Sequence, residues 1–150
     1  FVQDGLQVHE GVELTLTGKV TDSLTVMTGG TYMDLSIDKT NNSALKGKEP
    51  TGVASKLAKV YAEYDIFEIK GLTLTGGAYY TGEKNVDSAN TNKIPGVTIF
   101  DAGTRYKTKI NAYPTTFRIN VANLTDKDYW ASTETLGNPR NIAFSMKVEF

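Results

Sequence analysis

Few side chains in this chain are suited to chemistry on a substrate. The 150 residues include one histidine, His9, and no cysteine. Transition-metal sites usually need clusters of His or Cys, and a Ser–His–Asp triad would have to use His9, although no nucleophile-elbow sequence is present. We therefore expect no enzymatic activity, no cofactor and no protein-ligated metal, with His9 as a solvated polar residue.

Other polar motifs also have simple structural explanations. Asp34 and Asp38 near Asn41 lack the glycine and the final glutamate of a calcium loop. The asparagine-rich stretches at residues 41–43 and 90–92 are typical of turns. The formal net charge of −1 provides no basic field for nucleic acid, so we expect no nucleic-acid partner.

The last eleven residues, Arg140 to Phe150, predict a β-strand with one apolar face. Ile142, Phe144, Met146, Val148 and Phe150 alternate with Ala143, Ser145, Lys147 and Glu149. Side chains on a strand point to opposite faces in turn, so one face is wholly apolar and the other mostly polar. The pattern resembles the terminal strand of bacterial outer-membrane β-barrels, which direct apolar residues to lipid and polar ones to the lumen.

The same alternation recurs along the chain and predicts an all-β antiparallel meander of about seven strands. The expected strands are Val8–Val20, Ser23–Ile37, Val53–Phe67, Leu72–Gly82, Val97–Thr108, Pro114–Asn123 and Arg140–Phe150. No window approaches roughly 18 consecutive apolar residues, which excludes a transmembrane helix. The hydrophobic content of 39% still suits a transmembrane barrel, because only half of each strand must be apolar.

The connections between these strands alternate in length. Residues 21–22, 68–71 and 109–113 are short turns, whereas residues 38–52, 83–96 and 124–139 are long and polar. Transmembrane barrels have short periplasmic turns and long extracellular loops. This arrangement puts Tyr32 and Tyr80 near the outer rim, and Tyr64, Tyr106, Phe117 and Phe150 near the inner rim, as two interfacial bands. A general preference of tyrosine for strands accounts for the abundance of tyrosine but less well for the two bands.

Several stretches, in this order, resemble the C-terminal barrel of TonB-dependent outer-membrane receptors, in particular the siderophore-receptor branch. They are HEGVELTLTG (9–18), LTVMTGGTYMD (24–34), KGKEPTGVASKLAKVY (46–61), GGAYYTGE (76–83), IPGVTIFDAGTRY (94–106), NVANLTDKDYW (120–130), GNPR (137–140) and the terminal aromatic residue. Each motif is weak alone, but their order and spacing extend over nearly the whole chain. A single-chain bacterial barrel has an even number of strands, at least about eight, so seven strands predict part of something larger.

The resemblance implies that residues 1–150 are the C-terminal portion of a roughly 22-stranded transmembrane β-barrel, without its N-terminal plug domain and TonB box. It also implies uptake of a ferric siderophore at the bacterial outer membrane. The implied partners are the siderophore, the plug domain, the TonB complex through the missing N-terminal region, outer-membrane lipid and the barrel-assembly machinery.

The resemblance further suggests roles for individual residues. Asp101, Arg105 and Arg118 are candidates for facing the plug from the lumen, with the two arginines near the periplasmic end. Tyr129 and Trp130 are the best candidates for ligand contact, since aromatic rings pack on apolar or aromatic chelators. An outer aromatic girdle is the competing role for this pair. Phe150, Val148 and Met146 would form the signal for assembly.

Two other functions fit the pattern less closely. One is a soluble antiparallel β-sandwich that acts as a binding or adhesion module, for which solubility without a partner would be diagnostic. The other is a different outer-membrane barrel such as a porin, against which an upstream plug domain would argue.

Overall fold

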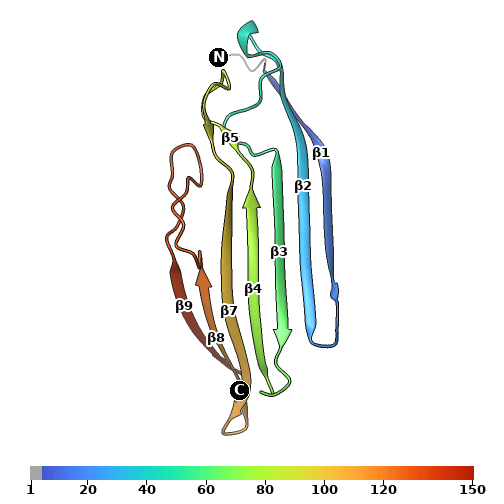
Figure 1. Cartoon of the computed structure of the whole chain (residues 1–150), viewed down its shortest axis with the longest axis vertical. Coiled ribbons are helices and arrows are strands. Elements are labelled where there is room, and N and C mark those ends of the chain that lie inside the picture. Colours follow the sequence, from blue (N-terminus) through green and yellow to red (C-terminus); the bar gives the residue numbers. More distant parts are fainter. Residues whose placement is uncertain (1–4) are drawn as a thin grey trace.

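Seven long strands form one antiparallel sheet in the computed structural model, which describes residues 5–150 (Figure 1). Each strand pairs with the next long strand along the chain. The strands are β1 (Leu6–Lys19), β2 (Leu24–Lys39), β3 (Lys56–Asp65), β4 (Leu72–Thr81), β7 (Val97–Ile110), β8 (Tyr113–Ala122) and β9 (Asn141–Val148). The predicted all-β meander is therefore confirmed.

The largest boundary difference lies at the start of β3, which was expected at Val53 and begins at Lys56. Pro50, Thr51 and Gly52 precede it in a turn, where Gly52 has a φ of 76°. Ala54 then pairs with Lys84 in an isolated bridge outside the main sheet. The apolar residues Val53 and Ala54 therefore belong to a contact between loops, which a strand pattern cannot distinguish from the strand itself.

Two of the long loops contain short elements that the sequence pattern did not predict. A 3-10 turn, η1 (Ser43–Leu45), begins after Asn42, whose Oδ1 accepts a hydrogen bond from the Ala44 N–H at 3.1 Å. A small hairpin pairs β5 (Lys84–Asn85) with β6 (Lys93–Ile94). Strands of two residues are too short to produce an alternating pattern, so residues 83–96 were predicted as a simple connection.

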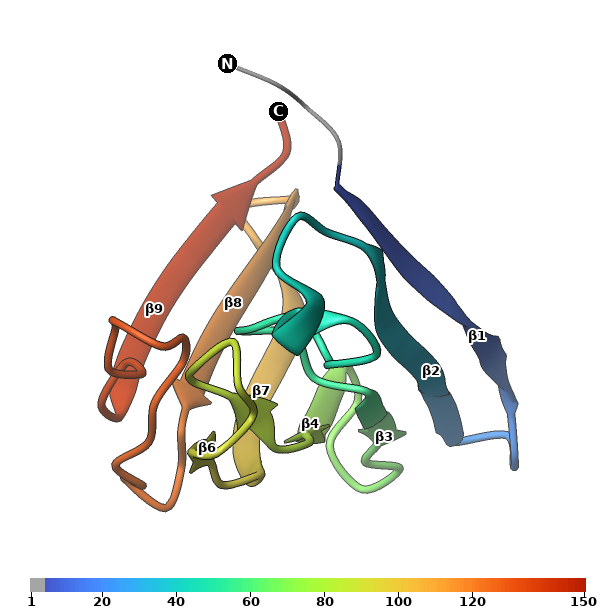
Figure 2. The same cartoon turned by 90° about the horizontal axis from the view of Figure 1, so that it is seen from above.

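The sheet is curved and does not close on itself (Figure 2). Its outward face carries exposed apolar side chains along every strand, such as Leu14 on β1 and Phe144 on β9. Among residues 5–150, only Leu35, Ala54 and Ile94 are buried apolar residues. A soluble sandwich needs two packed sheets with an apolar core between them, and this single sheet has no such core. The sandwich alternative is therefore wrong.

Short turns lie at one end of the sheet and long loops at the other (Figure 1). The turns join β1 to β2, β3 to β4 and β7 to β8, and the C-terminus lies at the same end (Figure 1). The predicted sorting of connections is confirmed. No helix in the described part of the chain is long and apolar enough to cross a membrane.

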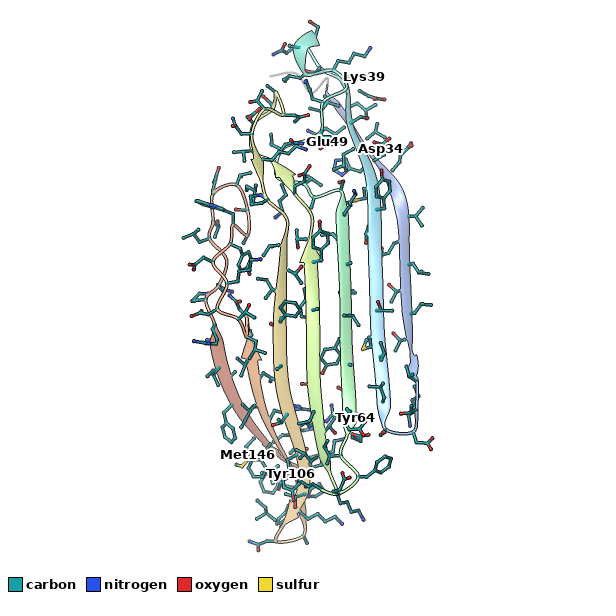
Figure 3. The ribbon with its side chains drawn as sticks, viewed as in Figure 1. Asp34, Lys39, Glu49, Tyr64, Tyr106 and Met146 are labelled. Atoms are coloured by element: carbon teal, nitrogen blue, oxygen red, sulfur yellow. The ribbon has the colours of Figure 1, made fainter. Side chains whose placement is uncertain are left out.

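The strand register places the outward aromatic residues in two bands. Tyr32 pairs with Val12 and Lys56 near the long loops, and Tyr80 pairs with Ala58 and Thr98 in the next row. Tyr64 and Tyr106 lie near the short turns together with Met146 (Figure 3). Between the bands, a row of small residues crosses the sheet through Ala62, Gly76 and Ala102.

Candidate functional site

The inward, concave face of the sheet carries a charged cluster toward the short turns. The guanidinium of Arg105 on β7 donates two hydrogen bonds to the carboxylate of Glu63 on β3, at 3.0 and 2.7 Å. The Tyr61 hydroxyl donates to the same carboxylate at 3.2 Å. The pair spans the intervening strand β4. Because both side chains are partly shielded from solvent, these charge-assisted hydrogen bonds are stronger than they would be in water.

The other two predicted plug-facing residues occupy different environments. Arg118 on β8 is the Cα partner of Arg105 on β7, is exposed, and forms no ion pair with any residue in the range 5–150. Asp101 lies closer to the long loops on β7, where its Oδ1 accepts a hydrogen bond from the backbone N–H of Asn123 at 2.9 Å. Arg105 and Arg118 therefore lie together, whereas Asp101 belongs to the base of the β8–β9 loop.

A hollow of about 210 Å³ lies between these groups, lined by Tyr61, Gly77, Tyr79, Asp101 and Asn120 among others. The Tyr79 ring lies over Gly77, where an added Cβ would come within 2.6 Å of the Tyr79 hydroxyl oxygen. Glycine at this position lets the aromatic ring lie flat along the strand. Polar and apolar side chains both line the hollow.

At the opposite end, hydrogen bonds join the first two long loops, residues 40–55 and 82–96. Glu49 donates its backbone N–H to Asn90 Oδ1 at 2.8 Å and accepts from Asn90 Nδ2 through its carbonyl oxygen at 2.9 Å. The Glu49 carboxylate accepts from Asn85 Nδ2 at 2.6 Å, and the Asn85 carbonyl accepts from the Gly52 N–H at 2.9 Å. Figure 3 shows Glu49 at this end, near Asp34 and Lys39.

Charged groups also stabilise the loop at residues 82–96 internally. Asp87 accepts hydrogen bonds from the backbone and side chains of Thr91 and Asn92, and these bonds, led by the Thr91 N–H, lower its pKa to about 2. Lys93 donates to the Glu83 carboxylate. This contact lowers the pKa of Glu83 and raises that of Lys93, mainly through the hydrogen bond itself.

The third long loop, residues 123–140, contains the predicted ligand-contact pair. Lys84 Nζ donates to the Ala131 carbonyl at 2.6 Å, which links this loop to its neighbour. Trp130 is 47% exposed and pairs with Leu136 in an isolated bridge, whereas Tyr129 is less exposed and covers Gly137. The two aromatic residues therefore differ, because Tyr129 packs within the loop and Trp130 presents its ring.

The chain ends on an exposed aromatic contact. The fully exposed Phe150 meets the Tyr113 ring edge-on, with centroids 5.4 Å apart, and Lys147 Nζ donates to Glu149 at 2.7 Å. Met146 and Val148 point to the outward face, as their pairing with Phe117 and Thr115 requires. The sequence predicted which face each residue occupies, but not Glu63 as the partner of Arg105 or Asn123 as the partner of Asp101.

Comparison with known proteins assigns the family. The sequence matches the family described as TonB dependent receptor-like, beta-barrel, over residues 1–124. The chain belongs to this family. It is 32% identical to the ferrichrome receptor of Yersinia enterocolitica over 97% of this chain and 20% of that protein. It is 30% identical to the ferrioxamine B receptor of Salmonella typhimurium over 94% of this chain and 21% of that protein.

A solved structure agrees with the assignment. The ferric preacinetobactin receptor of Acinetobacter baumannii superposes with a TM-score of 0.91 and 35% identity, over 99% of this chain and 23% of that chain. This chain of a TonB-dependent receptor barrel thus spans about a fifth of the length of these relatives. The family consists of outer-membrane transport receptors rather than enzymes. The outward apolar face is therefore the lipid face, the concave face is the lumen, and the long loops are extracellular.

Proposed function

We propose that this chain forms part of the barrel wall and three extracellular loops of a receptor that takes up ferric siderophores. The observation that carries the proposal is the close match, in sequence and in structure, to the ferric preacinetobactin receptor over nearly the whole chain. Binding is reversible and involves no covalent chemistry on the chelate. Trp130, exposed on the third loop, is the residue best placed to contact an apolar or aromatic part of the ligand.

The lumen face meets the plug domain of the same receptor. Arg118 is the best candidate for this contact, because it is exposed and forms no ion pair within residues 5–150. Arg105 is already neutralised by Glu63, and Asp101 is engaged with Asn123. A carboxylate on the plug would supply Arg118 with the charged partner that Arg105 already has in Glu63. The TonB complex acts through the N-terminal region, and the assembly machinery binds the terminal strand at Met146, Val148 and Phe150.

The first test is the intact mass of the native polypeptide in the outer-membrane fraction of the source cell. A mass several times 16.4 kDa supports a plugged receptor, and a product near 16.4 kDa contradicts it. The purified native protein is then titrated with ferrichrome, ferric ferrioxamine B and ferric preacinetobactin. Saturable binding of one chelate, with uptake of radioactive iron that stops when the proton gradient is collapsed, supports the function. Uptake that persists without the gradient would indicate a passive porin instead.

A further inference from the structure

Asn123 is an unusual residue at the point where β8 gives way to the third extracellular loop. It is only 3% exposed, although it carries a polar side chain and directly follows the end of β8. Its φ of 50° lies in the left-handed region, which asparagine adopts more readily than most residues. A buried polar side chain in a strained backbone conformation persists only where its hydrogen bonds compensate for both costs.

The side chain of Asn123 joins the two arms of the loop. Its Oδ1 accepts from the Lys127 N–H at 2.9 Å, and its Nδ2 donates to the Lys127 carbonyl at 2.9 Å and to the Asn138 carbonyl at 3.0 Å. Lys127 lies on the outgoing arm and Asn138 on the returning arm. One amide group therefore uses both of its donors and its acceptor to close the base of the loop.

The barrel wall holds Asn123 in turn. Its backbone N–H donates to Asp101 Oδ1 on β7 at 2.9 Å, and the next N–H, of Leu124, donates to the Phe100 carbonyl at 2.6 Å. Asp101 is thus the link between the wall and the loop. We call Asn123 with Asp101, Lys127 and Asn138 the loop-base clamp.

Above the clamp the two arms remain in register as far as Trp130. The Gly137 N–H donates to the Tyr129 carbonyl at 2.7 Å, and the Tyr129 ring occupies the space where a Gly137 Cβ would lie, 2.1 Å from the nearest ring carbon. The next pair is Trp130 with Leu136, and both side chains are exposed. The position of this apolar pair is therefore determined by the arms that the clamp brings together.

We propose that Asn123 is a positioning residue that fixes the third extracellular loop so that Trp130 and Leu136 present an apolar surface to an aryl or hydrocarbon part of the chelator. This inference rests on the proposed function. It assigns to Asn123 and Asp101 a role in ligand affinity without direct contact with the ligand, and it removes Asp101 from the plug-facing group.

The first experiment measures amide hydrogen exchange of the third extracellular loop in the absence of any ligand. Asn123→Gly in the full-length receptor keeps a residue that tolerates the left-handed φ but removes all side-chain hydrogen bonds. We expect faster amide hydrogen exchange in peptides covering residues 124–140 and no change in peptides covering residues 40–55. Asn90→Gly is the matched control, because Asn90 also has a positive φ and joins two loops. It should change exchange at residues 40–55 and leave residues 124–140 unaffected. Unchanged exchange at residues 124–140 in Asn123→Gly would overturn the proposal.

The second experiment is a double-mutant cycle on binding of whichever of ferrichrome, ferric ferrioxamine B and ferric preacinetobactin binds the native receptor. We expect Asn123→Gly to weaken binding by roughly tenfold. Asn123→Asp should weaken it at least as much, because it turns a buried carboxylate oxygen toward the Lys127 and Asn138 carbonyls near Asp101. With Trp130→Ala present, Asn123→Gly should have almost no further effect, because the two residues act through one contact. Fully additive effects overturn the proposal. If Trp130→Ala alone leaves binding unchanged, the ligand role proposed for Trp130 has failed, and the exchange experiment alone decides whether Asn123 positions the loop.

Discussion

Arg105 on β7 and Glu63 on β3 form a two-point ion pair on the lumen face, reaching across β4. Arginine suits this contact because its planar guanidinium matches both carboxylate oxygens at once. The pair therefore joins three strands of the barrel wall through side chains, in addition to the backbone ladder. It also leaves Arg118, which is exposed and forms no ion pair within residues 5–150, as a cation available to a partner on the lumen face.

Replacing Arg105 by methionine in the full-length receptor should lower the free energy of barrel unfolding by about 1–3 kcal/mol, because Glu63 is left partly buried without its charged partner. Arg105→Lys should cost less but still be measurable, since lysine cannot make the two-point contact. The effect would be measured by unfolding the receptor in urea and using the heat-dependent gel mobility of the barrel to determine the folded fraction.

The matched control is Lys59→Met. Lys59 lies on the same face of β3 as Glu63, is exposed, and forms no ion pair within the described residues. The substitution Lys59→Met should change the free energy of unfolding by less than about 0.5 kcal/mol. Equal losses in Arg105→Met and Lys59→Met would mean that the ion pair adds nothing.

Two glycines with positive φ should respond differently to alanine. Gly71 closes the β3–β4 turn at φ 90°, and an added Cβ would lie 2.2 Å from the Lys107 carbonyl oxygen on β7. Gly47 has φ 77° with nothing within 4 Å of an added Cβ. Gly47→Ala should cost about 1 kcal/mol from backbone strain alone. Gly71→Ala should cost clearly more, because the clash with Lys107 adds to similar strain. Thermal denaturation of the two variants would compare them, and equal losses would contradict the close approach to Lys107.

The strands were predictable from the sequence because the lipid face and the lumen face impose a strict period of two. The strand expected at Val97–Thr108, for example, begins at Val97 as predicted and ends at Ile110 in β7. The predicted faces of Phe100, Arg105 and Tyr106 follow directly from that alternation and agree with the register. The alternation of apolar and polar residues reflects only which face each side chain occupies, so it can be recognised from the sequence of each strand alone.

The side-chain partnerships were not predictable in the same way. Glu63 and Arg105 lie 42 positions apart, and their contact depends on the register of three strands. Asn123 was expected to end a strand, but its burial comes from Lys127 and Asn138, which the loop returns to it. Such contacts depend on the path that an irregular loop takes. Turn-forming residues such as asparagine indicate that the backbone turns, but not which residues the turn brings together.

Asn85 offers a test of the link between the first two extracellular loops. It is 2% exposed, and its amide donates to the Glu49 carboxylate. Asn85→Asp should loosen both loops more than Asn85→Ala does, because it places a buried carboxylate directly beside the carboxylate of Glu49 at neutral pH. Limited trypsin digestion in the full-length receptor, at Lys46, Lys48 and Lys84, would report the loosening. Mild acid should partly restore Asn85→Asp, since protonating one carboxylate replaces repulsion with a hydrogen bond. Asn85→Ala should show no such recovery, and equal behaviour of the two variants would contradict a direct contact with Glu49.

Asp87 predicts how the second extracellular loop responds to acid. Its pKa of about 2 lies below the ordinary value of 3.8, mainly because the Thr91 N–H donates to the carboxylate. Since the pKa is lower in the folded loop, the charged carboxylate contributes its full stabilisation above the ordinary value, and this is lost as pH falls toward about 2. Pepsin cleavage between β5 and β6 should therefore rise progressively as pH falls from the ordinary value of 3.8 toward about 2. Asp87→Asn cannot titrate at this position, so its cleavage should lack that step. The same dependence of cleavage on pH in the native receptor and in Asp87→Asn would mean that Thr91 and Asn92 do not hold the carboxylate. The loop would then present a free aspartate at the barrel mouth, and its conformation would not depend on this charge.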